Sequence, residues 1–128
     1  MNEAAVAPRF GVTSMVAPLR RVAMRWPGSA MVEADPNLWN YSERLDPECL
    51  NSQYQIFAEL VKECGAEIEW IPPEDDGLAD SSFTYDPSFV TGQGAILLRA
   101  GKKLREPEAE LHEALYKRLG VPVVGTIE

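Results

Sequence analysis

The chain has 128 residues, of which 45% are apolar and 25% are charged. This balance is typical of a globular domain and unlike that of a disordered chain. Twelve basic and 20 acidic residues give a net charge of −8, which argues against nucleic acid as a partner because both would be negative. Such a surface attracts cationic small molecules, although most acidic surfaces only serve solubility. Residues 1–16 contain no continuous apolar stretch, so we expect neither a signal peptide nor a membrane anchor, and a cytoplasmic location.

The first part of the chain predicts an arm, a strand and a long connection. Residues 1–17 are rich in alanine and lack periodicity, which indicates a flexible N-terminal arm before a domain spanning 18–128. Leu19–Arg25 is expected to form a strand, and Pro27–Gly28 ends it because this pair breaks strand hydrogen bonding. No period is visible over Ser29–Glu43, so we expect a connection with bulky, partly exposed side chains, as in lids and binding loops.

A helix with clear ends follows this connection. Asp46 is suited to accept hydrogen bonds from the free N–H groups of the first turn, and Pro47 fits the first helical position. Gly65 fits a left-handed cap at the other end. Apolar residues three and four apart form one stripe that we expect to be buried, namely Leu50, Tyr54, Phe57, Val61 and Cys64.

Strands dominate the next part of the sequence. Alternation of residue types predicts a half-buried strand over Ala66–Ile71. Further along, Pro87–Thr91 and Ala95–Arg99 flank a glycine-containing turn at 92–94, which is typical of a β-hairpin. We therefore expect these two segments to pair antiparallel.

The last predicted elements are a helix and a strand. The helix covers Glu106–Leu119 and ends at Gly120, and a strand begins at Val121. His112, the sole histidine, falls beside the leucine stripe of this helix and is expected to face solvent. The predicted order is β, α, β, β, β, α, β, an α/β chain in which each helix leads into a strand. The inner face of the helix is expected to consist of Leu111, Leu115 and Leu119.

Candidate binding residues are densest in the stretch 80–87. Asp80 and Asp86 bracket Phe83, and such carboxylates accept the N–H groups of a planar guanidinium while an aromatic face adds cation–π attraction. Taken alone, turn residues at both aspartates with a core phenylalanine are the commoner explanation. Arg99 and Arg105 follow the hairpin and are either carboxylate ligands or solvated surface charges.

Neither cysteine has the sequence setting of a catalytic nucleophile. Cys64 lies on the apolar stripe, so a buried structural thiol is expected. Cys49 lies in a first helical turn, a position that can activate a thiol, but no histidine is near it in the sequence. Phosphate loops, dinucleotide fingerprints and zinc-ligand spacings do not occur.

Taken in order, these residues resemble the motifs of guanidine-modifying enzymes. The run that begins at Asp80 and ends at Phe83 is similar to the D-S-x-F motif of dimethylargininases. The run Phe83–Pro87 resembles the F-T-R-D-P motif of arginine deiminases, with Tyr85 in place of the arginine.

Segments on both sides extend this resemblance over about Val12 to Glu128. Residues 94–101 are similar to the family's G-A-x-x-x-R-x-G, and Arg105 with Glu108 is similar to the R-x-x-E that follows. The opening strand resembles V-x-x-x-R-P-G more weakly, because a tryptophan is inserted before the proline. The resemblance is to the superfamily of dimethylargininases, arginine deiminases and amidinotransferases.

The resemblance implies the pentein fold, an α/β propeller of five β-β-α-β units, of which this chain would hold about one and a half. It also implies site residues without a metal or organic cofactor. Asp80 and Asp86 would hold the substrate guanidinium, with Phe83 packed against it. Arg105 would bind the substrate α-carboxylate, and Leu19 would belong to the loop covering the entrance.

The histidine and the late cysteine that act in this family have no match here. The resemblance therefore implies the N-terminal fragment of a guanidino C–N hydrolase, most like a dimethylargininase that converts methylated arginine to citrulline and methylamine, and inactive by itself. A fragment of an arginine deiminase or amidinotransferase shares these residues. A truncated chain that only binds a cationic ligand, or has no function, is the alternative of another class. Expected partners are methylated arginine or arginine, and further copies of the chain through uncovered edges.

Overall fold

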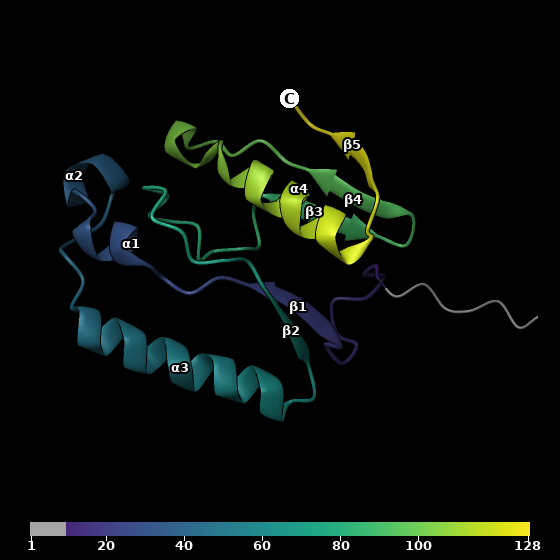
Figure 1. The fold of residues 1–128 in the computed structure, drawn as a ribbon, viewed down its shortest axis with the longest axis horizontal. Coiled ribbons are helices and arrows are strands. Elements are labelled where there is room, and N and C mark those ends of the chain that lie inside the picture. The colour runs from purple at the N-terminus through teal and green to yellow at the C-terminus, as the bar shows by residue number, and fades with distance from the viewer. Residues whose placement is uncertain (1–9) are drawn as a thin grey trace, which may run out of the picture.

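The computed structural model describes residues 10–128, so residues 1–9 of the predicted arm lie outside the described residues. Residues 10–17 contain no helix or strand. The rest is a mixed α/β arrangement with two small sheets (Figure 1). Within the described part, no helix combines the length and the apolar character needed to cross a membrane.

The first sheet and its helix match the sequence prediction. Strand β1 (Arg21–Met24) pairs in parallel with β2 (Glu67–Trp70), and helix α3 (Pro47–Glu63) connects them and contacts β2. Asp46 caps the helix, because its Oδ1 accepts a hydrogen bond from the backbone N of Cys49 at 2.7 Å. The strands and the helix predicted for this half are confirmed.

The prediction of an irregular connection over residues 29–43 is wrong in detail. Two short helices, α1 (Ser29–Glu33) and α2 (Pro36–Trp39), occupy it. The side chain of Asp35 caps α2, which begins with a proline. Trp39 is buried rather than partly exposed. Helices of four and five residues are too short to display a helical period, which is why the pattern was not visible.

The second sheet contains three strands in the order β3-β4-β5. Strands β3 (Ser88–Thr91) and β4 (Gly94–Leu97) form the predicted antiparallel hairpin, and β5 (Val123–Thr126) pairs in parallel with β4. A 3₁₀ helix, η1 (Lys103–Arg105), and helix α4 (Glu108–Leu119) connect β4 to β5. Helix α4 contacts β4 and β5, so it covers this sheet.

Seven of the buried apolar residues among the described ones form two separate clusters. One lies between α4 and the three-stranded sheet, and the other between the short helices and the segment before β3. The first cluster consists of Ala95, Leu97, Tyr116 and Val121, and the second of Ala34, Trp39 and Ala79.

Gly94 lies where the backbone at the start of β4 comes closest to the residues at and before β5. Its φ of +146° is one that residues with a side chain rarely adopt. A Cβ at this position would lie 2.4 Å from the carbonyl oxygen of Pro122 and 2.8 Å from Cγ1 of Val124. Only glycine therefore lets the segment before β5 lie against the start of β4.

The expected burial of the α3 stripe is wrong. Cys64 is exposed, as is Phe57, and Ala58 is the one residue of α3 that is fully buried. A two-stranded sheet covers too little of a 17-residue helix to bury its whole stripe. Part of the stripe is covered by Trp26, whose ring centroid lies 4.8 Å from that of Tyr54.

We expect the isolated chain to associate through the outer face of α3, where Ile56, Phe57 and Leu60 are more than half exposed. Sedimentation velocity should show concentration-dependent association. The double change Phe57→Lys and Leu60→Lys should reduce it, whereas Gln55→Lys on the same helix adds a charge without removing apolar surface. Equal association of both variants would contradict this prediction.

Candidate substrate-binding site

Arg105 is the centre of a charged network at the start of α4. Its Nη1 donates to Oδ2 of Asp86 at 2.6 Å, and its Nη2 donates to the backbone oxygen of Phe83 at 3.0 Å. Nε and Nη2 also donate to the two carboxylate oxygens of Glu108, each at 2.9 Å. The three-residue spacing across the helix start brings the guanidinium and this carboxylate together. Four of the five N–H donors of Arg105 are thus engaged.

The charges of both predicted aspartates act on Glu108. Glu108 is only 1% exposed, and this burial raises its pKa against the opposing effect of Arg105. The negative charges of Asp80 and Asp86 add to the rise in the pKa of Glu108. Hydrogen bonding to Glu108 in turn raises the pKa of Arg105. Asp86 and Glu108 are thus hydrogen-bonded to Arg105, whereas Asp80 acts on this network through its charge alone.

Asp80 is buried, and both of its oxygens have partners. The hydroxyl of Tyr41 donates to Oδ1 at 2.5 Å, and Nζ of Lys102 donates to Oδ2 at 2.8 Å. Burial and the hydrogen bond to Asp80 raise the pKa of Tyr41, so its hydroxyl remains a donor. The backbone of Asp80 also closes a turn, since its oxygen accepts from the N of Phe83 at 2.9 Å.

A hollow of about 520 Å³ lies beside this network. Asp86, Arg99, Lys102 and Arg105 contribute its charged walls. Asp80 and Phe83 are not among its lining residues in the described part of the chain; Asp80 reaches it through Lys102. The side chain of Phe83 is 53% exposed. The remaining lining residues are Leu98, Ala100, Gly101 and Ile127.

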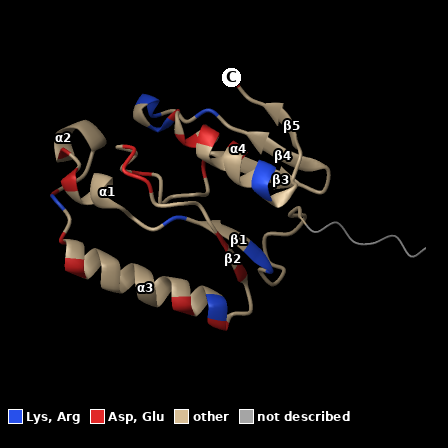
Figure 2. Cartoon of the chain, in the orientation of Figure 1, with Lys and Arg blue, Asp and Glu red and all other residues tan. Residues whose placement is uncertain are grey.

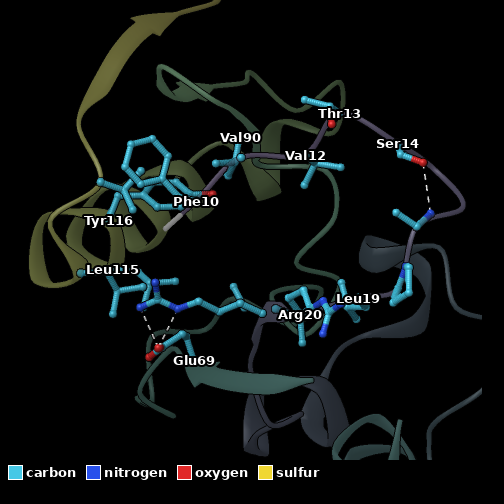
Figure 3. A pocket seen from close by; sticks show the side chains of 18 residues that line it. Phe10, Val12, Thr13, Ser14, Leu19, Arg20, Glu69, Val90, Leu115 and Tyr116 are labelled. Carbon is cyan, nitrogen blue, oxygen red and sulfur yellow. Dashed lines mark hydrogen bonds and ion pairs between the residues drawn. The ribbon is translucent and has the colours of Figure 1, made fainter. Parts of the chain in front are cut away.

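Leu19 lines a different cavity, of about 490 Å³, between the N-terminal segment and α4 (Figure 3). Phe10, Val90 and Tyr116 contribute apolar walls there, and Glu69, at the lower edge in Figure 3, pairs with Arg21 at 2.8 Å. Leu19 is half exposed and is not among the described residues that line the Arg105 hollow. The structure thus separates Leu19 from the other predicted site residues.

The expectation that His112 faces solvent is wrong. His112 is 2% exposed, and its Nδ1 shares a hydrogen bond of 2.7 Å with Oγ of Ser88. Burial lowers the pKa of His112 to about 4, and the positive charges of Arg105 and Arg25 act in the same direction. Glu108, His112 and Leu115 form their own helical stripe at spacings of four and three, the signal that would have indicated burial.

Arg25 is a buried residue that sequence reasoning missed. It donates to the oxygen of Pro72 at 3.1 Å, to Oγ of Ser81 at 2.6 Å and to Oδ2 of Asp76 at 2.6 Å. These bonds attach the end of β1 to the segment after β2, where acidic residues gather (Figure 2). Arg25 therefore positions the segment that carries Asp80.

The two cysteines and possible metal ligands are the remaining candidates. Cys49 and Cys64 are both exposed on α3, so the expectation of a buried thiol at Cys64 is wrong. Among residues 10–128, no group of three histidine, cysteine, aspartate or glutamate side chains is placed to hold a metal ion. The site is built from carboxylates, guanidinium and ammonium groups and aromatic rings.

No protein-family model and no curated protein sequence matches this chain. Solved structures do match it. A crystal structure of dimethylarginine dimethylaminohydrolase in an adduct with 4-chloro-2-hydroxymethylpyridine is 26% identical, with a TM-score of 0.69 over 86% of this chain and 41% of that one. A cysteine-to-serine variant of the enzyme from Pseudomonas aeruginosa, complexed with citrulline, is 25% identical, with a TM-score of 0.70 over 86% and 42%.

A histidine-to-glycine variant of dimethylarginine dimethylaminohydrolase, in an adduct with S-methyl-L-thiocitrulline, gives the same picture at 26% identity and a TM-score of 0.70, over 86% of this chain and 42% of that one. The chain spans about two fifths of the length of these structures. Its fold is part of a pentein, the fold predicted from the motifs. The chain is related to the pentein superfamily, and its neighbours there are dimethylarginine dimethylaminohydrolases.

Proposed function

We propose that this chain is the substrate-binding part of a guanidino C–N hydrolase of the dimethylargininase kind, which converts methylated arginine and water to citrulline and methylamine. The observation that carries the proposal is the superposition of 86% of the chain on dimethylarginine dimethylaminohydrolases, one of them complexed with citrulline. The charged network around Arg105 supports it, because it places opposite charges beside one hollow.

Four of the five predicted residues have a role in this proposal. Asp86 is half exposed on the wall of the hollow and offers a carboxylate to a guanidinium, and Asp80, now paired with Lys102, would offer a second one once that lysine moves away. Arg105 has one N–H donor left for a substrate α-carboxylate, since four of five are engaged within the described residues. The exposed ring of Phe83 would pack against the ligand, whereas Leu19 lines the other cavity and has no role at this hollow.

These residues bind and orient a ligand, and we assign no nucleophile among them. An arginine deiminase or an amidinotransferase would use the same contacts. These enzyme classes are therefore distinguished by which guanidino compound binds, not by the residues that hold it. A chain that only binds an organic cation is the candidate of another class. The ion pair between the Lys102 ammonium and Asp80 favours it, because it shows that this carboxylate accommodates a cation.

Binding of N-methylarginine by the 128-residue chain tests the proposal. We expect Asp86→Asn to weaken binding roughly ten- to a hundredfold, because a hydrogen bond to a charged group contributes roughly 1.5–3 kcal/mol. Arg105→Lys keeps a positive charge beside Glu108 and should weaken N-methylarginine more than agmatine, which lacks the α-carboxylate. NMR titration measures both dissociation constants.

Arg44→Ala is the control, because Arg44 is an exposed arginine that does not line the hollow. It should change neither dissociation constant. Unchanged N-methylarginine binding in Asp86→Asn, or an equal effect of Arg44→Ala and Arg105→Lys, would contradict the proposed site.

A further inference from the structure

The ammonium group of Lys102 lies in a box made by other parts of the chain. Its Nζ donates to Oδ2 of Asp80 at 2.8 Å and to the backbone oxygen of Trp39 at 2.5 Å. The same atom lies 4.9 Å from the ring centroid of Trp39 and 5.8 Å from that of Tyr41. The walls come from α2, from Tyr41 two residues after its end and from the segment before β3, so they are independent of the segment that carries Lys102.

The walls of this box have the chemistry that recognises organic cations. Aromatic faces attract a cation through their quadrupole, and a carboxylate and a carbonyl accept its N–H groups. Asp80 is 6% exposed, so its charge requires a cationic partner. We propose that this box is a binding site for a small alkylammonium or guanidinium ion, and that Lys102 is a tethered occupant which a free ligand must displace.

The position of Lys102 allows such a displacement. Its side chain is partly exposed and lies on a flexible four-carbon stem, and it also lines the hollow that contains Asp86 and Arg105. A guanidinium that docks on Asp80 in a forked pair needs both carboxylate oxygens. Oδ1 already accepts from Tyr41 and Oδ2 from Lys102, and Asp80 is buried, so a forked guanidinium has room at this carboxylate only after the ammonium leaves. Lys102 thereby determines which cations can bind at Asp80. This inference rests on the proposed function.

Removal of the tethered cation tests the box directly. We expect the Lys102→Ala chain to bind methylammonium and methylguanidinium about tenfold more tightly than the parent chain, as followed by the NMR signal of the Trp39 indole. Lys103→Ala is the matched control, because Lys103 is adjacent and exposed. Adding Asp80→Asn to Lys102→Ala should abolish the gain. Binding no tighter in Lys102→Ala than in the parent, or a gain that survives Asp80→Asn, would overturn the proposal.

The parent chain provides a second measurement that needs no variant. The Trp39 ring should shift the ε-methylene signal of Lys102 upfield, and methylguanidinium should return it toward its ordinary position. An ε-methylene that stays unshifted throughout saturation would overturn the box. If the box binds methylammonium while Asp86→Asn leaves N-methylarginine binding intact, the proposed function fails and the box stands.

Discussion

The Arg105→Ala chain is expected to lose about 3–5 kcal/mol of its free energy of unfolding, the cost of leaving a buried charge without its partner. Glu108 is almost fully buried, and both of its oxygens accept from Arg105. Without the guanidinium, Glu108 must either carry an uncompensated charge or take up a proton. Equilibrium unfolding in urea measures the loss.

Two further variants separate the buried pair from ordinary surface charge. Adding Glu108→Gln to Arg105→Ala removes the unpaired charge, so the double variant should be more stable than Arg105→Ala alone. Arg99→Ala breaks a pair that is 60% exposed on the arginine side, and it should cost less than about 1 kcal/mol. Similar losses in Arg99→Ala and Arg105→Ala would contradict the assignment of a buried pair.

Acid is expected to destabilise the fold through His112. Burial lowers the pKa of His112 to about 4 in the folded chain, against the ordinary histidine value of about 6.5. Between these values the unfolded chain binds the proton and the folded chain does not, so stability is complete above about pH 6.5 and is lost as the pH falls toward 4. The loss from this group is ~3 kcal/mol, because one pKa unit corresponds to about 1.4 kcal/mol.

The His112→Gln variant isolates this effect, because glutamine does not titrate and can still bond to Ser88. As the pH falls below about 6.5, the free energy of unfolding of the parent should decrease relative to that of the variant. Above this pH the difference between the two should stay constant. His112 is the sole histidine, so an NMR titration of the folded chain reads its pKa without overlap. A measured pKa near 6.5 would contradict the burial argument.

Elements with local start and stop signals could be predicted from the sequence. Helix α3 has its cap at Asp46 and its end near Gly65, and α4 ends at Gly120 with a φ of +73°. The hairpin between β3 and β4 follows from the turn at residues 92–94. In each case the decisive residues lie within a few positions of the element. Local signals therefore sufficed.

Burial depended on partners that are distant in sequence, and there the predictions failed. His112 is buried because its face of α4 packs toward Ser88 and the charges of Arg105 and Arg25, not because of the leucine spacing. Cys64 is exposed because only a two-stranded sheet covers α3. A helical period gives the direction of a face, but the area that covers it comes from tertiary packing.

The candidate site shows the same division. Asp80 and Asp86 were identified from one contiguous motif and Arg105 from a second one, and the structure pairs Arg105 with Asp86. Lys102 was not identified, since it reaches Asp80 only after Trp39 and Tyr41 have been brought beside it by α2. The predicted roles of the five site residues in substrate binding stay predictions.

The close backbone contact at Gly94 gives a structural reason for the first two residues of the G-A-x-x-x-R-x-G motif. A chain that lays the segment before β5 against β4 in this way requires glycine at that position, whether or not it ever meets a substrate. Ala95 beside it is completely buried and has room for little more than a methyl group. A relative recognised by this pair of residues is thus recognised by its sheet architecture. A chain with this sheet needs Gly94 and Ala95 even if it has lost every carboxylate of the site. Residues such as Asp80 and Asp86 are therefore the ones that distinguish a guanidine-binding chain from a chain that shares only the fold.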